Sequence, residues 1–428
     1  PVASCRLSSD AVPVRPMTDT PACIRCLYTT DHALGLTIDA EGICSGCRIH
    51  EEKDRLDFDA RWLKLVELVE PYRAKSGNTY DCIVPVTGAN DSHWIVHIVK
   101  ERLGLNPLLV TYNKYFNTPL GIRNLANLRI KFDCDILVQN VNPLSVKQIT
   151  RTTLRMFGSI YWPCLAGQTV FPVQTAVRFK VPLIIWGAHQ GLEQVGMFSH
   201  EHEVEMTRRY RKDHDLLGFE ADDLLTIFDT LREEDIWQYR YPDDADLDAI
   251  GVRGIYLGNY VRWDPKAQHM KMEETHGYRG ARFNRTFDTY DYVDCFNYMN
   301  LHDHLKLVKH GYSKVTDHAC REIRHGRLSR EEAQALVNRY EGQPPEHLAK
   351  FLDWLGIDAG GMDFIFNTHR NPRIWRESEP GRWVRRNLVD APAEDIALVE
   401  QRLCFAAASA LDYTDRGAYT IIGKGHPL

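Results

Sequence analysis

The hydrophobic positions in the first half of the chain fall into short runs separated by amphipathic stretches. Apolar runs that predict buried strands occupy residues 80–86, 107–111, 135–139 and 182–187. Between them, residues 91–103, 118–131 and 145–157 have the spacing of helices with one apolar face. Strands that alternate with helices in this way predict an α/β fold class with a doubly wound parallel sheet.

Ligands of such sheets bind beyond the carboxyl ends of the strands. Residues 87–92, 111–115 and 187–190 each follow or end a predicted strand, so we expect them on one rim. Thr111, Gly187 and His189 are therefore candidate binding residues. For His189, a loop histidine that only faces water is the alternative interpretation.

Helical spacing dominates the second half, and we expect the strands to stop after about residue 220. The predicted helices occupy residues 221–238, 299–310, 315–325, 329–341 and 345–356. Ser329 and Glu332 have the spacing of a capping box at a helix start. Upstream of the sheet, residues 58–72 predict an amphipathic linker helix.

Composition narrows the class of protein. The 428 residues are 44% hydrophobic and 26% charged, as in globular proteins, and the net charge of -6 argues against nucleic-acid binding through bulk basicity. No apolar run approaches the roughly 18 residues that a membrane helix requires. The first twenty residues lack the pattern of a secretory signal, so we expect a cytoplasmic protein without membrane partners.

Four of the eleven cysteines form two Cys-x-x-Cys pairs, Cys23 with Cys26 and Cys44 with Cys47, separated by residues 27–43. This spacing is typical of a four-cysteine zinc ribbon, in which Zn²⁺ joins two turns and has a structural role because no ligand position stays open. An iron–sulfur cluster on the same four thiolates is the rival interpretation. His32, between the pairs, is either a further ligand or a loop histidine.

The turn after the first predicted strand consists of Thr87, Gly88, Ala89, Asn90, Asp91 and Ser92. A strand, a turn and a helix in this order direct backbone N–H groups and the helix dipole at one point, which suits a phosphate. The hydroxyls of Thr87 and Ser92 add donors, and Asp91 either holds Mg²⁺ or caps the helix. A plain strand-to-helix turn is the alternative.

This loop resembles the SGGxDS signature of the PP-loop ATP pyrophosphatases, which activate a carbonyl oxygen by adenylation. The resemblance implies ATP and Mg²⁺ as ligands and Asp91 and Ser92 as catalytic residues. Thr87 replaces the signature serine. Ala89 replaces the second glycine, and its methyl group would crowd the pyrophosphate or strain a turn that needs positive φ.

The order of motifs resembles the N-acetyl sugar amidotransferases of bacterial surface-polysaccharide and nonulosonic-acid pathways. The cysteine pairs and the loop are followed by LHDHLK at 301–306, KHGYSKVTD at 309–317, REIR at 321–324, SREEA at 329–333, YEG at 340–342 and NPRIW at 371–375. We therefore expect a tail at 1–20, the zinc ribbon at 21–57, an ATP-binding α/β domain at 58–250 and a mostly helical domain at 251–428.

The resemblance implies conversion of an acetamido group of a sugar or sugar nucleotide to an acetamidino group, through an adenylated intermediate. Ammonia would come from a separate glutaminase subunit. Cys164 as a glutaminase nucleophile is an alternative, against a packed cysteine. The other function classes are a PP-loop enzyme that thiolates or amidates tRNA, and a degenerate binding subunit. The sequence leaves an oligomer open.

Charge and position suggest further substrate-binding residues. Arg151 and Arg155 lie one helical turn apart, suited to a phosphate or to an exposed basic face. Lys306, Lys314 and Asp317 lie inside the family-like block, where ion pairs between helices are the alternative. The histidines of the segment 200–203 point to different sides of a helix, so we interpret that segment as a solvated turn rather than a metal site.

Overall fold

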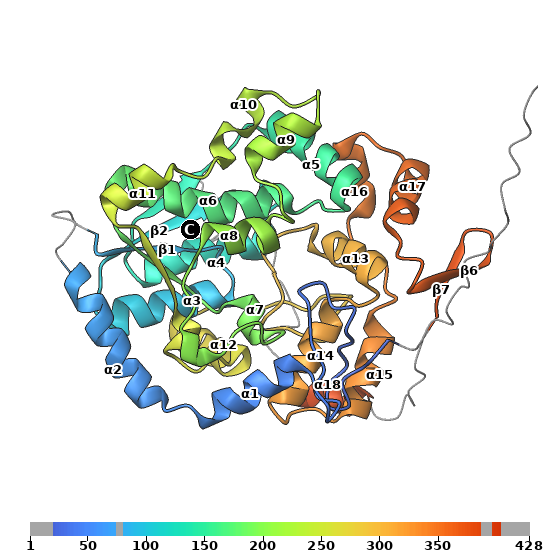
Figure 1. Ribbon diagram of the computed structural model, residues 1–428, viewed down its shortest axis with the longest axis horizontal. Coiled ribbons are helices and arrows are strands. Elements are labelled where there is room, and N and C mark those ends of the chain that lie inside the picture. Colours follow the sequence, from blue (N-terminus) through green and yellow to red (C-terminus); the bar gives the residue numbers. More distant parts are fainter. Residues whose placement is uncertain (1–19, 74–79, 387–395, 404–428) are drawn as a thin grey trace, which may run out of the picture.

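The computed structural model describes residues 20–73, 80–386 and 396–403, so the predicted tail lies outside it apart from Thr20. Its centre is a sheet of five parallel strands in the order β3-β2-β1-β4-β5 (Figure 1). The strands are β1 (Cys82–Pro85), β2 (Pro107–Tyr112), β3 (Ile136–Gln139), β4 (Leu183–Trp186) and β5 (Arg253–Tyr256). The α/β class with a parallel sheet is confirmed.

Alternation along the strands explains why helices cover both faces of the sheet. Ile83 of β1 belongs to one apolar cluster, with residues of the helix α6 (Trp162–Phe179). The next residue, Val84, belongs to the cluster on the other face. That face is covered by α2 (Phe58–Val69), α3 (Asn90–Val96), α4 (Pro119–Lys131) and α12 (Pro265–His276). Successive side chains of a strand point to opposite faces, so a continuous apolar run is buried on both.

All four predicted strands are confirmed, but the expectation that strands stop after about residue 220 is wrong. Strand β5 pairs in parallel with β4, and β6 (Trp375–Glu379) forms an antiparallel hairpin with β7 (Arg382–Arg385). Four residues are too few to show a strand pattern, and β5 is a strand because β4 offers it an edge. Its position also adds residues beyond 250 to the sheet.

Helices α3, α4 and α5 agree with the predicted segments, but α6, between β3 and β4, was not predicted. Helix α3 continues as a π-helix over His97–Arg102, and α5 covers Pro143–Phe157. Between β4 and β5 the chain forms short helices: α7 (Gln190–Glu193), α8 (Arg208–Tyr210), α9 (Ala221–Ile227), α10 (Glu233–Ile236) and α11 (Asp244–Ile250), with 3-10 turns at His200–His202 and Trp237–Tyr239 and a π-turn at Arg211–Asp215.

The C-terminal half is mostly helical. Its helices are α13 (Met299–His310), α14 (Lys314–Arg324), α15 (Arg330–Tyr340), α16 (Leu348–Leu355), α17 (Ala359–His369) and α18 (Ile396–Leu403). The capping box at α15 is confirmed, because Ser329 accepts a hydrogen bond from the Glu332 amide and Glu332 accepts one from the Ser329 amide. None of the helices that the structure describes is both long and apolar enough to cross a membrane.

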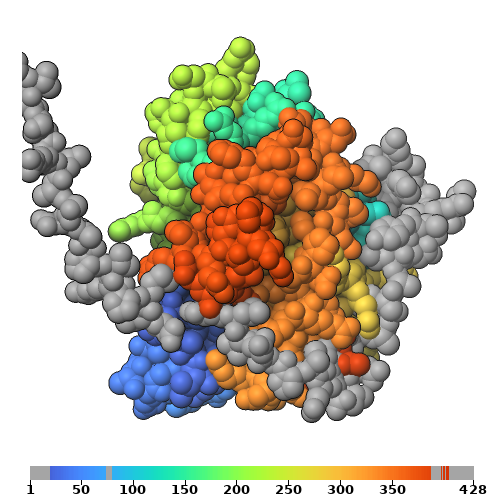
Figure 2. All heavy atoms as spheres, turned by 90° about the vertical axis from the view of Figure 1, so that its right-hand side faces the viewer, coloured from blue at the N-terminus to red at the C-terminus, as the bar shows by residue number. Residues whose placement is uncertain are grey.

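The segment that contains the two cysteine pairs, from Cys23 to Cys47, is called the cysteine segment below. It packs against this C-terminal half rather than against the sheet. Its buried residues share an apolar cluster with Cys320 of α14 and with Val195, which follows α7. From there α1 (Ser45–Arg55) and α2 run along one side of the molecule towards the sheet (Figure 1). In the perpendicular view the blue N-terminal segment lies beneath the orange helices, and the hairpin β6–β7 is in front (Figure 2).

Candidate active site

The 87–92 loop leaves the central strand β1 and leads directly into α3. The Thr87 amide donates to the Ser92 hydroxyl at 2.9 Å, and this bond closes the turn. Gly88 has φ +88°, and a Cβ on it would lie 2.9 Å from the Leu125 amide nitrogen of α4. Glycine is therefore required at position 88 by conformation and by the close approach of α4.

Ala89 lies outside the region of positive φ. With φ −70° and ψ 175° it is the extended N-cap of α3. The expectation that Ala89 strains the turn is wrong, because the left-handed residue of the loop is Gly88. A methyl group at an extended position costs the backbone nothing.

The loop forms one wall of a pocket of about 320 Å³ at the carboxyl ends of β1, β2 and β4. The lining residues include Thr87, Ala89, Asn90, Asp91, Ser92, Val110, Tyr112, Lys114, Tyr161, Gln168, Gly187, Gln190, Asp291 and Val293. This is the rim on which the sequence places the ligand site. The Asn90 amide group donates to the carbonyls of Pro265 and Tyr290, at 3.1 and 3.0 Å, and so ties the loop to two later segments.

A second pocket of about 190 Å³ adjoins the first and extends it towards α14. Asp91, Ala188, Gln190, Asp291 and Val293 line both, so the two pockets form one cleft. The far end of the second pocket is rich in charge. It is lined by Lys314, Asp317, His318, Arg321, Arg324 and His325.

Asp91 lies where the two pockets meet. Burial, with the neighbouring charge of Asp291 added to it, raises the pKa of Asp91 to about 7. Its Oδ1 is buried and has no hydrogen-bond partner among the described residues. A buried carboxylate oxygen without a partner at a cleft wall is a suitable ligand for a hard cation such as Mg²⁺.

Arg321 of α14 is the centre of an ion-pair network behind the cleft. It pairs with Asp288, Asp291 and Glu322. Burial opposes the ionisation of Asp288, but its neighbours His318 and Arg321 hold its pKa well below its usual range. The network fixes the segment before α13 against α14, and with it the carboxylate of Asp291.

The four predicted metal ligands lie together at the N-terminal end. Cys23, Cys26, Cys44 and Cys47 are all buried, and their sulfurs lie within 4.8 Å of one another. Cys26 Sγ is 3.6 Å from Cys44 Sγ, close to the roughly 3.8 Å expected between two ligands of tetrahedral Zn²⁺ at about 2.3 Å.

Backbone amides complete the surroundings of these sulfurs. Cys23 Sγ accepts hydrogen bonds from the amides of Arg25, Cys26 and Cys44 at 3.4, 3.4 and 3.3 Å. Amide donors of this kind stabilise a metal-bound thiolate. The four cysteines are therefore arranged so that they could hold a structural metal ion.

A family profile described as "LPS biosynthesis protein WbpG-like, C-terminal domain" matches residues 284–388. This connects the chain with lipopolysaccharide and sugar biosynthesis. An uncharacterized protein of Methanocaldococcus jannaschii, MJ1599, is 26% identical over 118 residues, which are 28% of this chain and 42% of that protein. The match thus spans less than half of this curated relative. The profile covers Asp291, Lys314 and Arg321 of the cleft.

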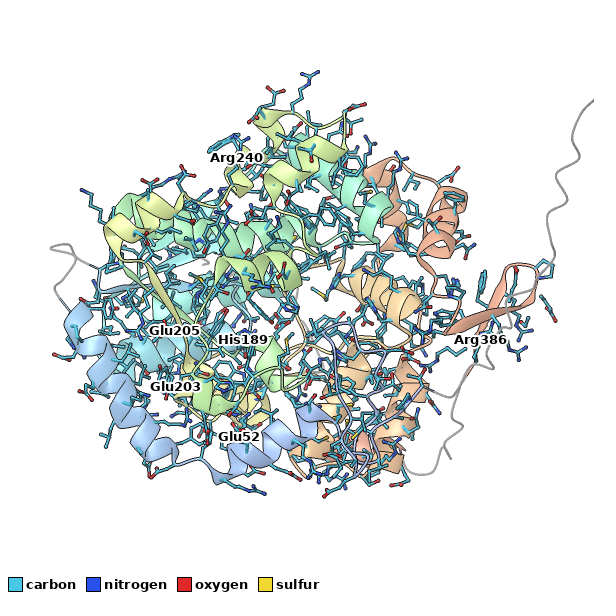
Figure 3. The ribbon with its side chains drawn as sticks, in the orientation of Figure 1. Glu52, His189, Glu203, Glu205, Arg240 and Arg386 are labelled. Carbon is cyan, nitrogen blue, oxygen red and sulfur yellow. The ribbon has the colours of Figure 1, made fainter. Side chains whose placement is uncertain are left out.

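Several predicted binding residues lie away from the cleft. Thr111 is not among its lining residues, because Val110 and Tyr112 face the pocket and alternation turns Thr111 to the other face of the sheet. His189 is also turned away. It lies beside α7, which it caps (Figure 3). Its ring packs against Tyr210 and Tyr256, and burial lowers its pKa to about 4.

The predicted substrate residues divide into two groups. Arg151 donates to the Leu355 carbonyl at 2.7 Å and so joins α5 to α16, while the carbonyl of Arg155 accepts from His369. Neither arginine lines the cleft. Lys314 and Asp317 line the second pocket, and Lys306 forms an ion pair with Asp317, which was the alternative interpretation.

The remaining candidate residues are packed in the protein and do not line the cleft. Burial raises the pKa of Cys164 to about 12, as for a packed thiol rather than a nucleophile. His32 stacks on Tyr312 and is not part of the four-sulfur cluster. The interpretation of 200–203 as a solvated turn is wrong for His200, which is buried against Glu52 of α1.

Lys114 and Asp291 are among the cleft residues that were not singled out from the sequence. Lys114 lies inside the predicted rim segment 111–115, so its location at the rim was predicted from the sequence. A binding role for its side chain was not predicted. Asp291 belongs to a segment without regular structure between α12 and α13. Only the folded chain brings it beside the loop.

Proposed function

We propose that this chain is an ATP-dependent, AMP-forming amidotransferase that converts the N-acetyl group of a sugar, nucleotide-linked or otherwise activated, to an acetamidino group. One observation carries the proposal. The 87–92 loop, which resembles a PP-loop, lines the same pocket as Asp291 and Val293, which lie inside the WbpG-like match. A loop that resembles a PP-loop and a segment that matches the WbpG-like profile therefore share one cleft.

The loop has groups suited to phosphate oxygens. The Gly88 and Asp91 amides donate to no acceptor within the described residues. The hydroxyls of Thr87 and Ser92 lie 3.5 Å apart beside them. Asp91 would hold Mg²⁺ through its unpartnered oxygen, and the ion would neutralise phosphate charge.

The second pocket suits the sugar acceptor because it adjoins the first and is lined by polar and charged groups. In the proposed reaction the amide oxygen of the acetamido group attacks the α-phosphorus of ATP, and pyrophosphate leaves. Ammonia then adds to the imidate carbon, and AMP leaves with the original oxygen. We expect the ammonia to come from a separate glutaminase.

For the four-cysteine cluster we propose Zn²⁺. Four thiolates leave a tetrahedral ion no open position, so the ion would hold the N-terminal segment in shape and take no part in the chemistry. Metal analysis of the purified protein distinguishes zinc from an iron–sulfur cluster, which would also give a visible absorption spectrum.

The test is the release of AMP and pyrophosphate from ATP in the presence of ammonium chloride and a panel of N-acetylated sugar nucleotides. We expect both products in equal amounts, dependent on acceptor and ammonia, with an amidine in the sugar product by mass spectrometry. Release that responds to tRNA and not to sugars would assign the chain to tRNA modification. No release with any acceptor would leave a binding subunit.

A further inference from the structure

Lys114 is a buried cation at the wall of the first pocket. It follows β2, which ends at Tyr112, and is 4% exposed. Its Nζ lies 2.8 Å from Cys295 Sγ, and it lines the pocket together with Tyr161. Cys164 and the carboxyl group of Asp294 also lie close enough to interact with its charge.

The lysine stays charged in this position. Burial favours the neutral amine, but the thiol group of Cys295 and the hydroxyl of Tyr161 outweigh it and raise the pKa of Lys114 above its ordinary value. A buried ammonium is costly unless it is paired with an anion. Among the described residues, no carboxylate forms an ion pair with Lys114.

Two other lysines, the buried Lys53 and the partly buried Lys306, each have a carboxylate partner. Lys53, which is 1% exposed, pairs with Glu193 Oε2 at 2.7 Å and donates to the Trp263 carbonyl at 2.8 Å. Lys306 pairs with Asp317. Lys114 has a thiol, a weak acceptor, within hydrogen-bond distance and a pocket on its other side. The nearby carboxyl group of Asp294 accepts from the Tyr278 hydroxyl and forms no ion pair with Lys114. We therefore expect the anion that pairs with Lys114 to be a ligand bound in the pocket.

We propose that Lys114 binds a phosphate group of the nucleotide in this pocket, and that Cys295 is a positioning residue that holds the ammonium in place. The inference rests on the proposed function, because it assigns a residue to the nucleotide of that reaction. A charged N–H···O⁻ bond to phosphate is stronger than the contact with sulfur. Lys114, which follows β2, would thus add a positive charge to the amides of the loop after β1.

The experiment compares the binding of ATP with Mg²⁺ and of adenosine, each by calorimetry, to the wild type and to Lys114→Met. Methionine has a similar length and no charge, so the pocket keeps its shape. We expect ATP to bind roughly 10- to 100-fold more weakly to the variant, since a hydrogen bond to a charged group is lost. Adenosine, which has no phosphate, should bind equally to both proteins.

Three further variants complete the comparison. Lys309→Met removes a lysine that donates to the Phe157 carbonyl outside the cleft, and should change neither affinity. Cys295→Ser keeps an acceptor for the ammonium and should bind ATP nearly as well as the wild type, whereas Cys295→Ala should bind it more weakly.

The outcomes separate the two proposals. A wild type that forms AMP, with a Lys114→Met variant of unchanged ATP affinity, overturns the role of Lys114 and leaves the proposed function standing. Equal losses of ATP and adenosine in the variant also overturn it, because the lysine would then only shape the pocket. A wild type that does not bind ATP overturns both proposals before any variant is compared.

Discussion

The Tyr28 hydroxyl donates a hydrogen bond to Asp317 Oδ1 at 2.9 Å, and through it the cysteine segment contacts helix α14. Both residues line the second pocket. Burial opposes ionisation of Asp317, but Lys306 and Lys314 hold its pKa well below its usual range, so it accepts this bond as a carboxylate. The segment that holds the candidate metal centre therefore supports one wall of the cleft, although it lies far from α14 in the sequence.

Replacement of Cys44 by Ser should remove the metal and loosen residues 20–56. These residues have no large core of their own, so a structural metal contributes to their folding on the order of 5 kcal/mol or more. Metal analysis should show one zinc per chain in the wild type and little in the variant. Limited proteolysis should cut the variant first in this segment, while the sheet stays protected because it has separate apolar clusters.

Cys134→Ser is the matched control for that experiment. Cys134 is also a buried cysteine, but its thiol donates to the Phe132 carbonyl and is not part of the cluster. Its replacement should leave the zinc content unchanged. Iron in the wild type, or equal zinc in both variants, would contradict the assignment of the four cysteines.

Asp91→Asn should reduce AMP formation by roughly 100-fold or more, because an essential contact to the charge of the reacting groups is lost. The melting temperature should stay the same or rise, since the variant no longer buries a carboxyl group that burial and Asp291 disfavour in its charged form. Asp133→Asn, at an exposed position outside the cleft, is the control and should be fully active. Full activity of the Asp91 variant would remove the residue from the site.

The sequence predicted those parts of the site that depend on neighbours along the chain. The apolar run at 80–86 and the turn residues after it are contiguous, and each cysteine pair is local, so both could be recognised directly. The pairing of Lys114 with Cys295 could not, because it depends on how the segment after α12 packs over the rim of the sheet. Thr111 was misplaced by a single residue, which in a strand is enough to reverse the face.

The pH dependence of stability distinguishes whether His189 is packed in the protein or binds a ligand. Burial lowers its pKa to about 4, so the native state binds fewer protons than the unfolded state between about pH 4 and 6.5. The stability that the neutral ring contributes is complete above about pH 6.5 and is lost as the pH falls towards 4. At pH 5 the loss should be roughly 2 kcal/mol.

His189→Asn keeps a side-chain oxygen for the cap of α7 but does not titrate. Denaturant unfolding at pH 7.5 and pH 5.0 should show a smaller loss of stability on acidification for this variant than for the wild type. Its ATP affinity at pH 7.5 should be unchanged, because His189 does not line the cleft. A large loss of ATP binding would restore the role that the sequence suggested.

The loop offers a sharper comparison, because Gly88 and Ala89 are adjacent and have opposite conformational requirements. Ala89→Gly changes a residue at φ −70°, where alanine is relaxed, so it should destabilise the fold by only about 0.5–1 kcal/mol through the greater freedom of the unfolded chain. ATP affinity should stay the same.

Gly88→Ala places a Cβ at φ +88° and 2.9 Å from the Leu125 nitrogen, so it should destabilise the fold by at least about 2 kcal/mol and weaken ATP binding as the loop shifts. Denaturant unfolding and calorimetry on both variants measure the two effects. If Ala89→Gly instead strengthened ATP binding several-fold, the methyl group would be crowding the phosphates after all, and the loop would bind them in a conformation different from the one described above.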